Sequence, residues 1–493
     1  MVWVLVGCQT SEPPRQGVAS VQEQQDATPA PDASVLSDAP EATDVPAADD
    51  VAEPPDATPT GHDVPRSPTD EGALPDSGTE ADAFGPNDAS LVEDSPEADD
   101  TSELAEIAEP DDTGAAGDAG QPDVPFPARY PPGQIHSPIT ASVVERLAEI
   151  HALDPVLAAD VFMKVGASTT STSSYLGCFA TNVDLGAYGD LQATLDFFLG
   201  GDAAGTDPFS RKTLSAKVGV SAVWAITGDP SPLEQEYLAL EPSLAFVHYG
   251  TNDIQLGTTP ESALWGFGEN LWTLIDELIG WGVVPIAVSI GHRLDNDAAD
   301  AWVPTYNAVI AGLAQGRQIP FLDLYVAYEP LPNYGIAGDG VHSSVYPSGA
   351  CLLTEAGLQY GMNTRNLHSL EALDRMRQVA LGGQPLDPPG PALQGTGTLD
   401  DPFIIDGALL FTDMRSTSDS PSSTFDLYSG CASTADESGP ERVYRLDLAA
   451  PASVRATVHD RGSVDIDLHV LDATATVMGC LARAHRLIDI DLD

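Results

Sequence analysis

Three short segments of the sequence combine residue types that support nucleophilic chemistry. Ser168 follows the apolar run "DVFMKVG", and Asn252 lies in "GTND" directly after the run "LAFVHY". Asp339 and His342 stand three residues apart in "GDGVHSS". The segments therefore supply a hydroxyl, a base, a carboxylate that can orient the base, and an amide, which together are the parts of an activated serine site.

Each residue has a distinct role in such a site. A serine hydroxyl attacks well when a base takes its proton, and we predict Ser168 as nucleophile, His342 as base and Asp339 as the orienting carboxylate. The oxygen of a tetrahedral intermediate becomes negative and needs fixed N–H donors. The Asn252 side chain, beside the backbone N–H of Ser168, is predicted to supply them.

Taken singly, these residues have simpler interpretations. Ser168 can cap a helix, Asn252 and Asp253 favour turns, and His342 can be an ordinary loop residue. His248 lies inside its apolar run and is predicted to be packed in the core. The joint occurrence of the polar groups at the ends of apolar runs favours a catalytic site.

The apolar runs predict the framework that positions these groups. Helical spacing of apolar residues predicts an amphipathic helix over 140–152. Strands are expected at the runs 160–166, 215–222, 244–250, 283–290 and 319–325, with helical patterns at 260–281 and 299–315 and a further helix within 353–380. Apolar strands that alternate with helices predict a parallel sheet covered on both faces, with function at the carboxyl ends of the strands.

In this order, the motifs around Ser168, Asn252 and His342 resemble those of the SGNH, or GDSL-type, hydrolase superfamily over residues 155–375. The resemblance implies a flavodoxin-like three-layer α/β/α fold with a five-stranded parallel sheet. It implies a Ser-His-Asp triad that includes Asp339, and neither a cofactor nor a metal.

The resemblance also implies the composition of the oxyanion hole. Its donors would be the backbone N–H of Ser168, the side chain of Asn252 and the backbone N–H of Ala222. Ala222 stands where the family has the glycine of G-x-S-G, and Ala167 replaces the aspartate of Gly-Asp-Ser. These two departures leave the triad residues in place.

Two classes of function follow. The first is a serine esterase or acyl hydrolase that acts on a small acyl ester, a lipid or an acetylated polysaccharide, with an acyltransferase as its variant. The second is a non-catalytic binding or adhesion protein of the cell surface built on the same scaffold. Labelling with a fluorophosphonate separates them, because only an activated serine reacts.

Charge and composition limit the partners. The net charge of −55 excludes nucleic acid and an anionic membrane surface as expected partners. Residues 9–125 hold 30 Asp or Glu and 2 Arg in an Ala/Pro/Ser/Thr-rich background, so we predict a disordered acidic linker. Before it, residues 1–8 end in Leu-Val-Gly-Cys, which resembles a lipobox and predicts lipidation at Cys8. A lipoprotein at the cell envelope or extracellular surface, with membrane contact only through its lipid, is the expected location.

The four later cysteines predict two disulfides in an exported chain without a C-x-x-C motif. Cys178 follows Ser168 by ten residues, and Cys351 follows His342 by nine. If the serine and the histidine meet, these two cysteines can join. The remaining pair is Cys431 with Cys480.

Composition divides the rest of the chain into three parts. The hydrolase-like domain is expected at 126–385, a Pro/Gly-rich linker at 386–402 and a β-sandwich at 403–493, where the pattern alternates with period two. The last part weakly resembles a pre-peptidase C-terminal domain, of which only part is expected here. The run from Asp465 to His469 suggests a metal site, but we interpret it as one face of a strand.

Overall fold

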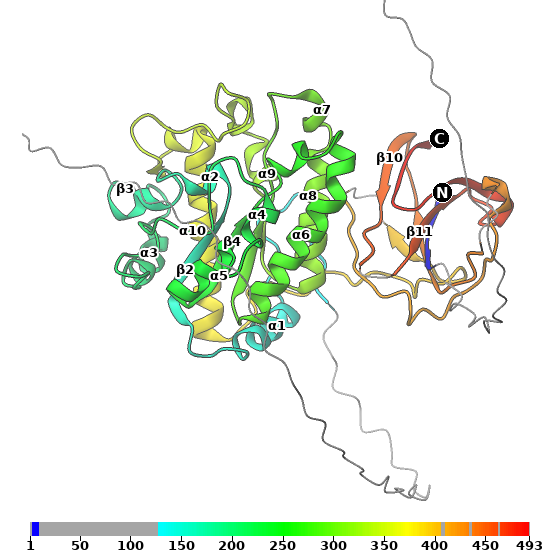
Figure 1. Cartoon of the computed structure of the whole chain (residues 1–493), viewed down its shortest axis with the longest axis horizontal. Coiled ribbons are helices and arrows are strands. Elements are labelled where there is room, and N and C mark those ends of the chain that lie inside the picture. The colour runs from blue at the N-terminus through cyan, green and yellow to red at the C-terminus, as the bar shows by residue number, and fades with distance from the viewer. Residues whose placement is uncertain (1, 9–126, 406–409, 433–435, 462–463, 493) are drawn as a thin grey trace, which may run out of the picture. The chain divides into compact units, whose positions relative to one another are not determined.

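The computed structural model describes residues 2–8, 127–405, 410–432, 436–461 and 464–492 (Figure 1). The predicted disordered linker, 9–125, lies outside these residues. Within the described part of the chain, no helix combines the length and the apolar character needed to cross a membrane.

A parallel sheet forms the centre of the α/β domain. Its strands lie in the order β2 (Ala158–Gly166), β4 (Pro242–His248), β5 (Val284–Val288) and β6 (Phe321–Leu322), and every neighbouring pair is parallel. Residues 244–248 and the whole of β5 are buried, as expected for strands covered on both faces.

Helices cover both faces of this sheet (Figure 1). The helices α6 (Pro260–Gly280) and α8 (Val303–Arg317) pack on each other and on β5, whereas α10 (Gly361–Gly382) contacts β6. Thr259 begins α6 with a reciprocal capping box, since its hydroxyl accepts from Ser262 N while the Ser262 hydroxyl accepts from Thr259 N. The predicted three-layer α/β/α fold is confirmed.

The smaller elements of the domain connect these layers. The helix predicted at 140–152 is α1 (Ala141–His151), whose Val143, Leu147 and Ile150 are buried. The others are α2 (Ser168–Ser171), η1 (Gly177–Ala180), β3 (Val183–Asp184), η2 (Gly189–Leu191), α3 (Gln192–Leu199), α4 (Ala222–Ala225), α5 (Pro232–Leu240), η3 (Asp253–Gln255), α7 (Asp297–Asp300), α9 (Leu324–Tyr328), η4 (Pro332–Gly335), β7 (Cys351–Leu352) and η5 (Gly357–Gln359).

The sheet has four strands rather than the expected five. The run 215–222 meets β2 only through an isolated bridge at Ala216, because its backbone bonds go to the N–H and C=O of Gly166, the last residue of β2. Gly219 then turns the chain with φ +76°, and α4 starts at Ala222. The segment therefore crosses the carboxyl end of the sheet as a loop.

The last predicted strand is also shorter than its apolar run. In the run 319–325 only Phe321 and Leu322 pair with β5. Asp323 ends the strand because its side chain accepts from Val326 N and caps α9.

The C-terminal part contains two sheets. The larger has the order β12 (Cys480–Ala484), β11 (Ile466–Leu471), β1 (Val2–Cys8), β9 (Glu441–Leu446) and β8 (Phe403–Ile405). The smaller pairs β10 (Ala452–Thr457) with β13 (Leu487–Leu492), and the short helices η6 (Ser429–Cys431) and η7 (Val477–Gly479) flank β12. Apolar residues of both sheets share one cluster: Leu468, Val470, Ile488 and Leu492.

The N-terminal strand β1 is antiparallel to both its neighbours, β9 and β11. Cys8 is its last residue and lies opposite Ile466. Residues predicted as the end of a signal peptide thus form a strand inside the larger sheet, and lipidation of Cys8 stays a prediction.

Both predicted disulfides are present. Cys178 and Cys351 are joined with a Cα–Cα distance of 5.5 Å, and Cys431 and Cys480 with one of 5.3 Å. The first, which we call the α/β-domain disulfide, links η1 to β7. The second, the C-terminal disulfide, links η6 to β12.

Candidate active site

Ser168 lies where β2 ends at the carboxyl edge of the sheet. It is the first residue of the short helix α2 and is partly exposed. Gly166 allows this sharp turn, because a Cβ atom at this position would lie 2.5 Å from the Thr170 hydroxyl and 2.8 Å from the His248 carbonyl.

The loop after η4 brings a histidine and an aspartate to this serine. Ser168 Oγ lies 2.8 Å from His342 Nε2, and His342 Nδ1 lies 2.7 Å from Asp339 Oδ2. An ionised carboxylate only accepts hydrogen bonds, so Nδ1 carries the proton and Nε2 accepts from the serine hydroxyl. The three residues that the sequence singled out therefore form a continuous Ser-His-Asp chain of hydrogen bonds.

Asp339 is held as an anion by its own loop. Partial burial raises its pKa, but the N–H groups of Val341 and His342, each 3.0 Å from Oδ1, and the His342 ring outweigh burial and lower the pKa to about 2. The carboxylate thus stays charged at neutral pH and fixes the histidine tautomer.

Asn252 lies at the end of β4, in the turn that follows Gly250. Gly250 has φ +124°, a conformation that favours glycine. One N–H of the Asn252 amide donates to the carbonyl of Val220 at 2.8 Å. An amide nitrogen carries two hydrogens, so this bond orients the side chain and leaves one donor for another acceptor.

Ala222 does not present a free N–H in this structure. Its amide donates to Asp253 Oδ1 at 2.9 Å, and the amide of Gly250 donates to Oδ2 of the same carboxylate at 2.9 Å. Its predicted role as an oxyanion donor stays a prediction, and the oxyanion would have to share this N–H with Asp253.

Asp253 is almost completely buried between the two loops. Burial raises its pKa to about 6, against the opposing effect of the N–H donors of Ala222 and Gly250. The sequence marked this residue only as a turn former. Its position shows that it ties the end of β4 to the start of α4.

Two buried arginines brace the site, and neither was predicted from the sequence. Arg293 donates to the carbonyl of Thr251 and forms a two-pronged ion pair with Asp295 at 2.8 and 2.9 Å. Asp295 packs so closely on Gly340 that a Cβ at that glycine would lie 2.5 Å from the Asp295 backbone nitrogen. The turn that carries Asn252 is thereby connected to the loop of Asp339 and His342.

Arg365 braces the serine. It lies on α10 with no exposed surface, and its guanidinium donates to Thr169 O at 2.8 Å and to Thr170 Oγ1 at 3.1 Å. It also stacks over the Tyr175 ring, 3.7 Å from the centroid. No sequence signal distinguishes Arg365 from other polar residues of α10, since the burial that defines it depends on the tertiary packing.

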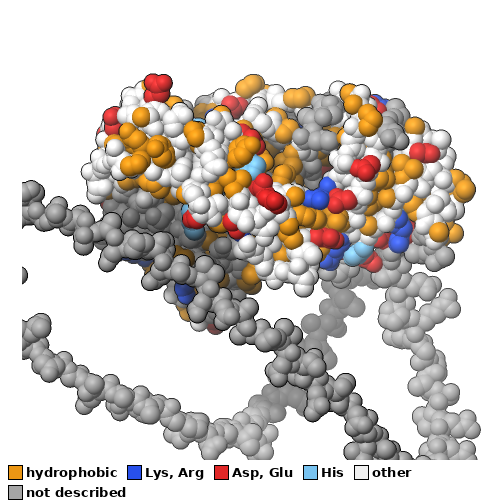
Figure 2. All heavy atoms as spheres, turned by 90° about the horizontal axis from the view of Figure 1, so that it is seen from above, with side chains coloured by type: hydrophobic (Ala, Val, Ile, Leu, Met, Phe, Trp, Pro, Cys, Tyr) orange, Lys and Arg blue, Asp and Glu red, His pale blue; other side chains and the backbone are white. Residues whose placement is uncertain are grey.

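The triad is open to solvent. The His342 and Asp339 side chains are 47% and 52% exposed. Figure 2 looks down on the end of the domain where α2 and α7 follow their strands, and shows hydrophobic and acidic side chains with few basic ones between them. Both a small molecule and a group on a large molecule can therefore approach the serine.

The residues that we predicted to have structural roles lie outside the triad. His248 is buried in the core, with Nδ1 3.3 Å from the Thr169 hydroxyl, as predicted. Asp467 and His469 are buried on β11, and His469 stacks on Tyr428 at a centroid distance of 3.6 Å. Asp465 lies in a group with Asp460 and His485.

Comparison with known proteins gives a family match and similar solved structures. The GDSL-like Lipase/Acylhydrolase family matches residues 194–346, a range that holds Asn252, Asp339 and His342 but begins after Ser168. Curated proteins give no significant match.

Two of the similar solved structures are a lipase and an esterase. A GDSL-like lipase from Bacteroides thetaiotaomicron VPI-5482 is 17% identical with a TM-score of 0.28, over 48% of this chain and 98% of its own. The acetylxylan esterase Axe2 from Geobacillus stearothermophilus is 14% identical with a TM-score of 0.30, over 44% and 95%. Likeness at these scores carries no argument about function. The family match, with the motifs around Ser168, Asn252 and His342 in the order of the superfamily, identifies the domain as a GDSL-like hydrolase of the SGNH superfamily.

Proposed function

We propose that this chain is a serine esterase that cleaves carboxylic esters through Ser168, His342 and Asp339. The observation that carries the proposal is the pair of hydrogen bonds, 2.8 Å and 2.7 Å, that joins these side chains at the carboxyl edge of the sheet. Because the serine comes from a segment far from the other two residues in the sequence, packing alone does not readily explain why the three side chains are hydrogen-bonded in the order Ser-His-Asp.

The reaction proceeds in two halves. His342 Nε2 takes the proton of Ser168 as Oγ attacks the ester carbonyl, and the same proton passes to the alkoxide that leaves, so that an alcohol and an acyl-serine result. Water then gives a proton to His342 and attacks the acyl group. The proton returns to Ser168 Oγ as the carboxylic acid departs.

The oxyanion formed in both halves needs donors. The unused N–H of the Asn252 amide and the backbone N–H of Ser168 are the proposed donors. Asn252 is already oriented by Val220 O, so little reorganisation is needed when the charge develops.

Fluorophosphonate labelling and hydrolysis of p-nitrophenyl acetate test the proposal. Wild type should label and turn over, whereas Ser168→Ala should do neither. His342→Ala should lose nearly all turnover, and the matched control His151→Ala, which changes an exposed histidine at the end of α1, should behave as wild type. A folded wild-type protein that neither labels nor turns over would favour the binding protein over the esterase.

We also propose attachment to the cell surface through a lipid on Cys8, on the basis of the "LVGC" motif. The proposal has a structural cost, because cleavage before Cys8 removes Val2–Gly7 and with them nearly all of β1. Mass spectrometry of the membrane fraction should find a lipidated N-terminal Cys8, and Cys8→Ser should abolish partition into detergent. A mature chain that still contains residues 2–7 would refute the anchor.

A further inference from the structure

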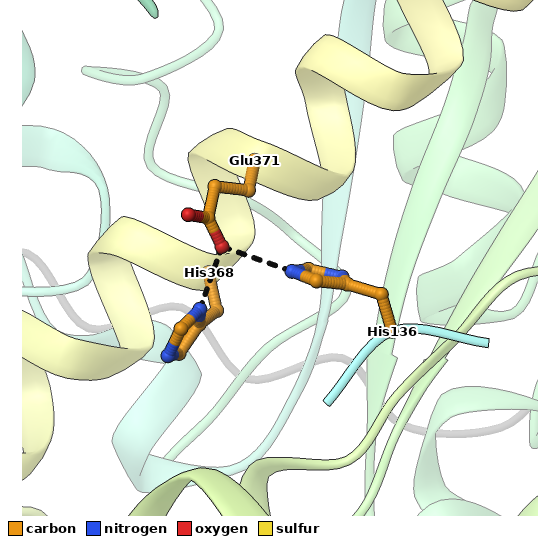
Figure 3. A group of neighbouring side chains, drawn as sticks. All are labelled: His136, His368 and Glu371. Carbon is orange, nitrogen blue, oxygen red and sulfur yellow. Dashed lines mark hydrogen bonds and ion pairs between the residues drawn. The ribbon is translucent and has the colours of Figure 1, made fainter. Parts of the chain in front are cut away.

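Two histidines and a glutamate converge on one point away from the triad. Glu371 Oε2 lies 3.0 Å from His136 Nε2 and 2.7 Å from His368 Nδ1 (Figure 3). His368 and Glu371 are one turn apart on α10, while His136 comes from the segment before α1. We infer that His136, His368 and Glu371 form a binding site for a divalent transition-metal ion, with zinc as its natural fit.

The donor atoms suit such an ion. One ligand atom from each residue lies within 4.8 Å of the other two. Zinc in proteins takes imidazole nitrogen and carboxylate oxygen at about 2.0–2.2 Å, which puts neighbouring ligands of a tetrahedron about 3.3 Å apart. The two nitrogen–oxygen distances need to lengthen by only a few tenths of an ångström. Small side-chain rotations therefore make room for an ion.

The backbone already holds the ligands in place. His136 forms an isolated antiparallel bridge with Leu322 of β6, and its neighbour Ser137 donates its N–H to the Phe321 carbonyl at 2.9 Å. The other two ligands sit on the 22-residue helix α10. A site built on a sheet edge and a long helix loses little chain entropy when an ion binds.

The site is also accessible to solvent. The side chains of His136, His368 and Glu371 are 19%, 14% and 27% exposed, so they are sheltered but still reached by solvent. Three protein ligands leave one tetrahedral position for water.

The nearby cation does not oppose binding strongly. Arg375 lies next to His136 but donates to Asp387 Oδ2 at 2.6 Å and to the Ser137 carbonyl at 3.1 Å. Its charge is thus paired with a carboxylate. With neutral imidazoles, metal binding only moves each ring proton to the nitrogen on the other side, so no net proton release is required.

The consequence would be a metal clamp between the start of the domain and its last helix. The ion would bridge residues 235 positions apart in sequence, His136 and Glu371. It would act on stability rather than on the reaction, because in the described part of the chain none of the three residues forms a hydrogen bond with a triad side chain.

Zinc titration of the metal-free full-length chain tests the inference. The titration is run at high salt, which weakens diffuse binding to the acidic segments. Isothermal titration calorimetry should show one saturable high-affinity equivalent, and free zinc at one hundred times its Kd should lower the unfolding equilibrium constant about 100-fold. Cobalt in place of zinc should give the visible absorption of a four-coordinate site.

The variants decide where the ion binds. His368→Ala and Glu371→Gln should weaken zinc binding by more than the ~10–100-fold lost with an outer-shell partner. Both should also remove the cobalt spectrum. Glu371→Gln keeps a carbonyl acceptor for one histidine, so it preserves more of the hydrogen bonding, and a melting curve without metal checks that each variant folds.

The matched control is the other candidate group, formed by Asp460, Asp465 and His485 in the C-terminal part. Asp465→Asn should leave the high-affinity binding of one zinc ion unchanged. If this variant removes the high-affinity zinc binding, or if zinc binds equally to wild type and His368→Ala, the inference is wrong. It is equally wrong if wild type binds zinc only weakly and without saturation, since the three side chains then form only a hydrogen-bonded cluster.

Discussion

Truncation of Asn252 is the most informative perturbation of the proposed oxyanion hole. Its amide has two donors, one of which is bound to Val220 O at 2.8 Å while the other is free for substrate. Asn252→Ala removes both. Loss of the first should cost the folded state only about 1 kcal/mol, because the residue is partly exposed and water can replace the bond.

Loss of the second donor acts on the reaction. The interaction strengthens as the carbonyl oxygen becomes negative, so kcat should fall about 10²–10³-fold, which corresponds to about 2.7–4 kcal/mol of transition-state stabilisation. KM should change little, because the neutral ester gains less from the same donor. The small stability cost and the large kinetic effect therefore separate the catalytic interpretation from the turn-forming one.

The assay combines steady-state hydrolysis of p-nitrophenyl acetate, fluorophosphonate labelling and a thermal melt. Asn252→Ala should still label slowly, because Ser168 and its base survive, whereas Ser168→Ala should not label. Gln255→Ala is the matched control, since Gln255 is exposed in the same turn. If folded Asn252→Ala turns over as fast as wild type, Asn252 is not an oxyanion donor and the reasoning fails.

Three further predictions concern the support of the site. Burial raises the pKa of Asp253 to about 6, so its contribution to stability is greatest below the unfolded pKa near 3.8 and is lost as pH rises through 6. The difference in unfolding free energy between wild type and Asp253→Asn should therefore shift by about 3 kcal/mol between pH 3 and 7. A difference that stays constant over this pH range would contradict the prediction. Removal of the α/β-domain disulfide by Cys178→Ser should destabilise the domain by about 2–5 kcal/mol and lower the hydrolytic activity that remains on heating, whereas Cys431→Ser, at the C-terminal disulfide, should leave hydrolysis unchanged. Equal effects of the two variants on hydrolysis would be evidence against a local brace. Arg365→Met leaves the Thr169 carbonyl without its guanidinium donor, so kcat and the rate of fluorophosphonate labelling of the folded variant should both fall about 10–100-fold. An unchanged labelling rate would refute the positioning role.

The sequence predicted well those features that depend on local pattern. Strand ends are visible as apolar runs that stop at polar residues, and this pattern alone was enough to place Ser168 and Asn252 at one edge of the sheet. The expected proximity of Ser168 to His342 then led to the correct pairing of Cys178 with Cys351.

Features set by tertiary packing were missed or misjudged. The run 215–222 is as apolar as a strand, but its backbone reaches only the last residue of β2, which periodicity does not reveal. Arg293 and Arg365 are long charged side chains, which are usually exposed, and only their buried carbonyl and carboxylate partners show what they do. The hydrogen bond from Ala222 N–H to the Asp253 carboxylate also depends on tertiary packing, and the sequence does not reveal it.

The carboxylate of Asp253 joins two loops that sequence comparison would treat as separate motifs. It accepts hydrogen bonds from Ala222 N on one side and from Gly250 N on the other, so a substitution in either loop should affect the other loop through this single buried carboxylate. In evolutionary terms, substitutions in these loops should be epistatic: a residue tolerated after position 222 in one relative need not be tolerated in another whose turn at position 250 differs. The departure from the family glycine at position 222 is then best understood together with the turn that faces it, and residues of the two loops should covary among relatives.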